Sequence, residues 1–321
     1  MPDWSLKTPV VFLIFNRPAT AVRVFEAIRN ARPPQLLVVA DGPRPNRAGE
    51  ADRVREVRDI VSRHDWECEV LTNYSEVNLG CRQRVSSGLN WAFGLVEEAI
   101  ILEDDCVPHP TFFRFCEELL EKYRDDRRIM HISGDHFPFV PADQSETSYY
   151  FSRYAHVWGW ATWRRAWQYY DASTDVWHGA RDRAVFVHEF ERPEERSFWL
   201  RTWSTVFSGG IDSWAYQWTF TCIMQHGLAI MPNVNLVSNI GFGADATHLG
   251  QQDPLAASLP TEDMRFPLKH PRAMIRNVEA DWLTGRFFFS DRNLLQRAVN
   301  RLERLRARWL RAWSKPRAAG K

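Results

Sequence analysis

The chain has 321 residues, 45% of them hydrophobic and 25% charged, which is enough for one large or two modest domains with a buried core. Forty-one basic and 40 acidic residues leave a formal net charge of +1, so the overall charge excludes a strongly basic nucleic-acid-binding protein. The five cysteines are odd in number and show no C-x-x-C spacing, which favours reduced thiols in the cytoplasm over disulfides or a zinc site. No signal peptide or membrane-spanning stretch is visible.

In chain order, the first 135 residues alternate short apolar runs with helical patterns, which predicts an α/β fold with a parallel sheet. Strands are expected at residues 10–15, 36–40, 68–71, 100–102 and 129–133. Helices are expected after Pro18, over residues 50–64 and 82–96, and after Pro110.

The alternation fades after residue 135. Residues 149–167 are dense in aromatic side chains, and residues 194–207 and 212–226 have helical patterns. Residues 228–270 are rich in Asn, Gly, Pro and Asp, so they are expected to be mainly loop.

The C-terminal segment, residues 292–321, holds ten Lys or Arg and one acid, for a local charge of +9. Its apolar side chains fall on one face of a basic amphipathic helix, which could lie on an anionic membrane surface as a peripheral attachment. Two other interpretations stay open: a helix that packs on the acidic remainder of the chain, or a partly ordered tail.

Three consecutive carboxylates, Glu103, Asp104 and Asp105, follow the apolar run 99–102. If that run is a buried strand, the acids emerge at its carboxyl end, where open α/β sheets bind ligands. Adjacent acids repel one another unless a cation offsets their charge, and their hard oxygen ligands favour Mg²⁺ or Mn²⁺, which often bridge to a phosphate. The alternative is a solvated acidic turn.

Polar side chains follow three other predicted strands at the same edge: Arg17 after the first, Asp41 after the second and Asp135 after the last. An Arg, a ribose- or base-binding Asp and a metal-binding acid cluster together suit a nucleoside diphosphate. No G-x-G-x-x-G follows the first strand and no G-x-x-x-x-G-K-[ST] exists, so a dinucleotide fold is disfavoured and a P-loop is excluded.

Taken in order, these motifs resemble the nucleotide-sugar glycosyltransferases of the GT-A fold. The likeness is greatest to the family 2-like, metal-dependent N-acetylglucosaminyltransferases that begin complex N-glycan branches, and to their bacterial relatives. It spans roughly residues 9–250 and rests on these segments: Asn16-Arg-Pro18, Asp41-Gly42, Asn78-Leu-Gly80, Leu102-Glu-Asp-Asp105, 108–113, 158–163 and 212–218.

The resemblance implies a Rossmann-like, mixed and mainly parallel sheet flanked by helices. It implies a catalytic domain over residues 1–290, with a nucleotide-sugar half at about 1–136 and an acceptor half at about 137–290. The basic segment 291–321 would follow as a tail.

The resemblance also implies roles for individual residues. Arg17 would contact the diphosphate, Asp41 the base, and Glu103 and Asp104 the sugar or ribose, while Asp105 would coordinate Mn²⁺ or Mg²⁺. Simpler interpretations remain open for two of these residues: a surface ion pair for Arg17 and an ordinary turn for Asp41.

Asp212 would be the base that deprotonates the acceptor hydroxyl, although it could also serve as the N-cap of the helix that follows it. Arg82 and Arg84 could approach the phosphates or lie on a solvated helix face. His248 could give a second contact to the metal or the diphosphate. Three tryptophans could form platforms for a sugar ring, with at least one of them expected in the core: Trp158, Trp160 and Trp214.

These features predict an inverting, metal-dependent glycosyltransferase that moves a sugar from a nucleotide diphosphate to a glycan or lipid-linked acceptor, as in bacterial polysaccharide or glycoconjugate synthesis. Two alternatives are a retaining enzyme of the same fold and a non-catalytic module that binds nucleotide sugars or membranes. A sugar-phosphate nucleotidyltransferase is disfavoured because the Gly-rich, Arg- and Lys-bearing first loop of that class is missing.

Overall fold

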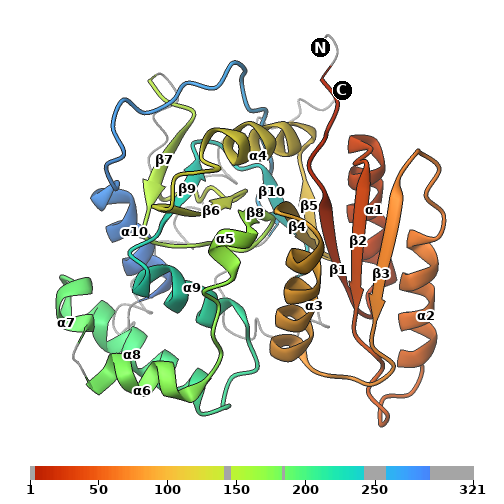
Figure 1. The fold of residues 1–321 in the computed structure, drawn as a ribbon, viewed down its shortest axis with the longest axis horizontal. Helices are drawn as coiled ribbons and strands as arrows, with labels where there is room; N and C mark the ends of the chain where they lie inside the picture. The colour runs from red at the N-terminus through yellow and green to blue at the C-terminus, as the bar shows by residue number, and fades with distance from the viewer. Residues whose placement is uncertain (1–3, 141–145, 183–184, 242–257, 290–321) are drawn as a thin grey trace, which may run out of the picture.

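The computed structural model describes residues 4–140, 146–182, 185–241 and 258–289 (Figure 1). The predicted basic segment 291–321 and His248 lie outside these residues. Among the residues described, no helix is long and apolar enough to cross a membrane.

The centre of the fold is an eight-stranded sheet in the order β3-β2-β1-β4-β8-β6-β9-β7. Six of these strands run in one direction, and β8 and β7 run against them. The strands are β1 Val10–Ile14, β2 Gln35–Ala40, β3 Glu69–Tyr74, β4 Glu98–Glu103, β6 Ile129–Ser133, β7 Tyr149–Ser152, β8 Trp160–Trp163 and β9 Leu228–Pro232. A separate antiparallel pair joins β5 Cys106–Pro108 to β10 Val237–Asn239.

Helices cover both faces of the sheet (Figure 1). They are α1 Pro18–Ala31, α2 Glu50–Val61, α3 Cys81–Leu95, α4 Pro110–Lys122, α5 Arg164–Trp167, α6 Thr174–Asp182, α7 Phe186–Glu189, α8 Pro193–Phe207, α9 Ala215–Met224 and α10 Val278–Phe288. The mixed, mainly parallel sheet flanked by helices confirms the predicted fold class.

Alternation along the central strands divides the core into two layers. Phe12 of β1 packs in a cluster with α1, α2 and α4, whereas its neighbour Val11 packs in a second cluster with α3, α5 and α9. A third cluster lies among α6, α7, α8 and α9 and consists mostly of rings, including Trp177, Trp199 and Trp203. Much of the aromatic surplus of the second half therefore forms core.

Residues 228–270 were expected to be mainly loop, and most of those that the structure describes do lie outside helices and strands; the exceptions are β9 and β10. Another feature of the second half was not predicted. Strand β8 comes from the aromatic segment 149–167 and pairs antiparallel with both β4 and β6. Strands from the two predicted halves therefore alternate within one sheet.

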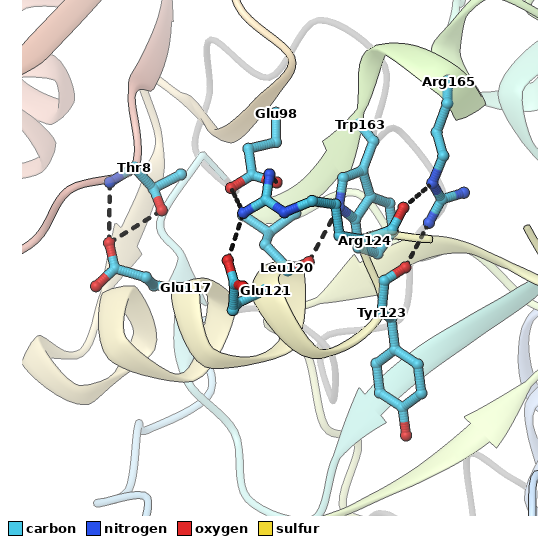
Figure 2. A network of polar contacts seen from close by, with 9 residues as sticks. All are labelled: Thr8, Glu98, Glu117, Leu120, Glu121, Tyr123, Arg124, Trp163 and Arg165. Carbon is cyan, nitrogen blue, oxygen red and sulfur yellow. Dashed lines mark hydrogen bonds and ion pairs between the residues drawn. The ribbon is translucent and has the colours of Figure 1, made fainter. Parts of the chain in front are cut away.

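Hydrogen bonds join the C-terminal end of helix α4 to β8 and to α5, which follows β8 directly (Figure 2). The Trp163 indole N–H donates to the carbonyl of Leu120 at 3.2 Å, and the Arg165 guanidinium donates to the carbonyls of Tyr123 at 2.8 Å and Arg124 at 2.6 Å. The last carbonyls of a helix have no partner within the helix, so these bonds satisfy them and place a cation at the negative end of the helix dipole.

Candidate functional site

The carboxyl ends of β2, β1 and β4 lie side by side, because these strands are parallel neighbours in the sheet. Burial raises the pKa of the Cys81 thiol at the start of α3, and four predicted site residues lie near enough for their charges to act on it: Glu103, Asp212, Arg17 and Asp41. Hydrogen bonds fix two of these positions, since the backbone N–H of Cys81 donates to Asp212 and that of Gly80 donates to Asp41. The structure thus brings together residues from four separate parts of the sequence.

Arg17 is the cation among the acids of β4. Its Nη1 atom donates to Asp105 Oδ2 at 2.5 Å and lies 3.9 Å from Asp104 Oδ1. Asp104 is buried and also accepts a hydrogen bond from the backbone N–H of Phe15 at 2.9 Å. Arg17 is the last residue of the three-residue connection between β1 and α1, directly before Pro18, which begins the helix.

If all three acids were ionised, the cluster would hold more negative charge than Arg17 offsets. Burial, followed by the charge of Asp105, raises the pKa values of Glu103 and Asp104. Arg17 lowers both pKa values, and a hydrogen bond from the Trp214 indole lowers that of Glu103 further. A second cation would therefore be stabilised at this edge.

The acids of this site could bind a divalent metal ion only together with ligands from outside the protein. The described part of the chain contains no group of three or more His, Cys, Asp or Glu side chains arranged as metal ligands. However, Mg²⁺ is commonly held by one or two carboxylates together with substrate phosphates and water. Asp105 and the excess negative charge fit that arrangement, so the metal remains a proposal tied to a phosphate-bearing substrate.

The carboxylate of Asp41 points into the protein and is bound by residues 78–80. It is 6% exposed, and it accepts hydrogen bonds from the backbone N–H groups of Leu79 at 2.9 Å and Gly80 at 3.1 Å and from the Asn78 amide at 3.0 Å. Burial raises the pKa of Asp41, whereas these backbone bonds lower it. In this structure Asp41 holds the segment before α3 against the end of β2.

Asp212 is exposed and lies in the connection between α8 and α9. Its two oxygens accept hydrogen bonds from the backbone N–H groups of Cys81 at 2.9 Å and Arg82 at 3.0 Å. The N-cap of α9 is Trp214, so Asp212 does not cap the helix that follows it. It caps α3 instead, across more than a hundred residues of sequence.

The structure does not support the expected roles of three other residues. The Arg84 guanidinium is buried and donates to the backbone and side-chain oxygens of Asn73 at 2.7 and 2.6 Å, so it is held against β3. Trp160 is fully buried and Trp214 is 2% exposed, and their rings stack at 5.5 Å within the core. These two rings lie in the core and offer no open surface to a sugar, and the Trp214 indole donates a hydrogen bond to Glu103.

The remaining two predicted residues stay close to the edge of the sheet. Trp158 is half-buried and donates its backbone N–H to Asp135 Oδ2 at 3.3 Å. Asp135 is 2% exposed, and its Oδ1 atom has no hydrogen-bond partner. Arg82 is half-buried in the first turn of α3.

Two residues at the site were missed by the sequence analysis. A side chain on Gly241 would place its Cβ 2.0 Å from Asp105 Oδ2 and 3.0 Å from Arg17 Nη1, so the Gly241 backbone lies directly on this ion pair. The Asn239 side chain accepts the Gly241 N–H at 2.8 Å. A glycine directly after Asn239 and Ile240 was a signal for such a close approach.

Comparison with known proteins supports no family assignment. No family model and no curated protein matches the chain. Solved structures with a partial likeness include a UDP-glucose pyrophosphorylase complexed with UDP-glucose, at 10% identity and a TM-score of 0.26 over 46% of this chain and 63% of that chain. HddC from Yersinia pseudotuberculosis matches at 9% identity and a TM-score of 0.31, over 49% of this chain and 77% of that chain. A cytidylyltransferase from Leptospira borgpetersenii matches at 9% identity and a TM-score of 0.30, over 51% of this chain and 63% of that chain.

These matches span about half of the chain and less than two thirds of the pyrophosphorylase and the cytidylyltransferase. None of the three is described as a glycosyltransferase, so the resemblance to the N-acetylglucosaminyltransferases is not confirmed. What the chain does must be argued from its own site.

Proposed function

We propose that this chain is an inverting, metal-dependent glycosyltransferase that moves a sugar from a nucleoside diphosphate to a glycan or lipid-linked acceptor. The observation that carries the proposal is the convergence of Arg17, the acids of β4 and Asp212 around the start of α3. Cationic and acidic groups then lie on the donor side, and a fixed carboxylate lies on the acceptor side.

On the donor side, the Arg17 guanidinium is suited to pair with a diphosphate, since it presents several N–H donors in a fixed plane. Asp105 would hold Mn²⁺ or Mg²⁺ together with phosphate oxygens. Such an ion, when bound, stabilises the negative charge of a departing diphosphate. Glu103 and Asp104 would accept hydrogen bonds from sugar or ribose hydroxyls.

On the acceptor side, Asp212 would take the proton from the attacking hydroxyl group. Each of its oxygens accepts one backbone N–H and keeps a second lone pair for that proton. The acceptor oxygen would form its bond to the anomeric carbon on the face opposite the leaving diphosphate oxygen. The bond to that oxygen breaks as the new bond forms, and the anomeric configuration inverts.

The test compares purified wild-type protein with Asp105→Ala and Asp212→Asn in the presence of Mn²⁺, a panel of nucleotide sugars and a panel of acceptors. We expect Asp212→Asn to lose about 10²- to 10⁴-fold in transfer while it still binds the donor in calorimetry. Asp105→Ala should lose donor binding that depends on Mn²⁺. Asp52→Asn, an exposed change on α2, is the matched control.

Three outcomes would decide against the proposal. Full transfer by Asp212→Asn rejects the base assignment. A product with retained anomeric configuration favours the retaining alternative. Donor binding without turnover across the whole acceptor panel favours a non-catalytic binding module.

A further inference from the structure

Four consecutive backbone N–H groups, those of residues 79–82, are shared between two carboxylates of the site. Leu79 and Gly80 donate to Asp41 at 2.9 and 3.1 Å. Cys81 and Arg82 donate to Asp212 at 2.9 and 3.0 Å. We call residues 79–82 the clasp, because this short segment joins the carboxylate after β2 to the carboxylate between α8 and α9.

Gly80 is the point at which the clasp changes direction. Its φ of 79° and ψ of 164° belong to a region that residues with a side chain rarely adopt. Because the chain turns there, the N–H groups before and after the turn face different carboxylates. A Cβ atom added to Gly80 would lie 2.7 Å from Asp212 Oδ2, closer than such contacts occur.

The clasp gives Asp212 an orientation that its own surroundings do not supply. The residue is exposed, and the N-cap of α9 is Trp214 rather than Asp212. The first N–H groups of a helix have no partner within the helix, and the helix dipole attracts an anion to them. At α3 that anion is the Asp212 carboxylate, which is thereby fixed relative to Asp41.

We propose that Gly80 is the positioning residue of the site: it lets the clasp hold Asp212 at a set place beside the donor-binding edge. This inference rests on the proposed function for its catalytic meaning. Gly80 touches no substrate and acts through Asp212. A side chain at this position displaces Asp212, and the effect falls on turnover more than on donor binding.

The first experiment measures the clasp without any activity assay. Unfolding midpoints are compared for wild type, Gly80→Ala, Asp212→Ala and the double variant, with Gly94→Ala as control. Gly94 lies in the same helix, and nothing lies within 4 Å of a Cβ added there. We expect Gly80→Ala to lower the midpoint less in the Asp212→Ala background than in wild type, since the clashing carboxylate is gone. Equal losses in both backgrounds would overturn the proposal.

The second experiment covers the case in which Gly80→Ala does not fold. Hydrogen exchange at the amides of Cys81 and Arg82 is measured in wild type and in Asp212→Ala. We expect at least tenfold faster exchange at these two amides in the variant, with the rates at Leu79 and Gly80 unchanged because Asp41 still binds them. Unchanged exchange at Cys81 and Arg82 contradicts the clasp.

The third experiment separates kcat from KM. We expect Gly80→Ala to lower kcat at least tenfold with the donor KM within about twofold of wild type, and Gly94→Ala to leave both unchanged. A change confined to the donor KM would overturn the positioning role. If the wild type transfers no sugar to any acceptor, the proposed function fails, whereas the midpoints and exchange rates still decide whether the clasp exists.

Discussion

The guanidinium of Arg17 lies 2.5 Å from a carboxylate oxygen of Asp105, and the Arg17 side chain is 22% exposed while that of Asp105 is 10% exposed. This pair lies among three acids, so it offsets only part of their charge. The balance between Arg17 and the acids therefore depends on pH, and so does its effect on stability.

Replacing Arg17 with Met should destabilise the protein by about 1–3 kcal/mol, which is less than for a fully buried pair because Arg17 is partly exposed. Burial raises the pKa values of Glu103 and Asp104, and loss of Arg17 should raise them further. Acids with a raised native pKa lose their contribution to stability as pH increases through that value, and the substitution moves this value further from that of the unfolded chain. The destabilisation caused by Arg17→Met should therefore be greater at about pH 8 than at about pH 5. Urea unfolding at both pH values measures this.

The control for this prediction is Arg29→Met. Arg29 pairs with Asp65 on the surface, with side chains 49% and 52% exposed. Its replacement should leave the free energy of unfolding almost unchanged at either pH, because both charges are exposed to solvent. A loss for Arg17→Met that does not change with pH would contradict the charge imbalance.

Replacing Gly241 with Ala should disturb the Arg17–Asp105 pair directly. The added Cβ would come 2.0 Å from Asp105 Oδ2, and such overpacking costs about 1–3 kcal/mol. Gly179→Ala is the matched control, because nothing lies within 4 Å of a Cβ added there. Thermal unfolding of the two variants should show a clear loss for Gly241→Ala alone; equal midpoints would mean that the segment moves away at no cost.

Replacing Asp135 with Asn should make the protein relatively more stable as pH rises. Burial raises the pKa of Asp135 well above its usual value, and its Oδ1 atom has no hydrogen-bond partner. The wild-type protein therefore loses stability as pH rises through the native pKa of Asp135, whereas the Asn variant has no group to ionise at this position. The difference in unfolding free energy between variant and wild type should favour the variant more at about pH 8 than at about pH 4. A constant difference would rule out this ionisation.

Acidification should destabilise the protein through His131. Its Nδ1 accepts from the Trp218 indole at 3.2 Å, so its Nε2 carries the proton and donates to the His156 carbonyl at 2.7 Å. Burial lowers the pKa of His131 to about 3. Between that value and the unfolded-state value of about 6.5, the unfolded chain binds a proton that the native state does not, so stability falls as pH falls through this window.

The His131→Asn variant, which removes the titrating imidazole and keeps a polar group near the Nδ1 position, should show a shallower dependence of the unfolding free energy on pH over the same window. The dependence should not vanish, because burial also lowers the pKa of His156 to about 4. Identical slopes for variant and wild type would show that His131 does not titrate on unfolding.

Much of the N-terminal half of the fold could be predicted because its signals are local. The apolar runs of β1, β2 and β4 and the helical stripes of α1 to α4 are each contained within one short window of sequence. Strand β8 could not be found in this way, since it has only four residues, two of them tryptophans, and its antiparallel partners lie more than 25 residues away.

The site residues divide along the same line. The positions of Arg17 and Asp105 follow from strand ends, which are local. The partners of Asp212 are backbone N–H groups 130 and 131 residues away, which no spacing reveals. Arg84 could have been recognised as buried, since Gly88, one helical turn later, packs against Val39 of β2 and marks the face of α3 turned toward the sheet.

The position of β8 has a mechanical consequence. Its ladders to β4 and β6 join strands from the two halves of the chain into one hydrogen-bonded layer. The halves therefore cannot swing apart as hinged lobes without breaking that layer. Any adjustment of the candidate site must come from the connections that leave the carboxyl edge of the sheet, and sequence changes can accumulate there while the layer beneath stays rigid.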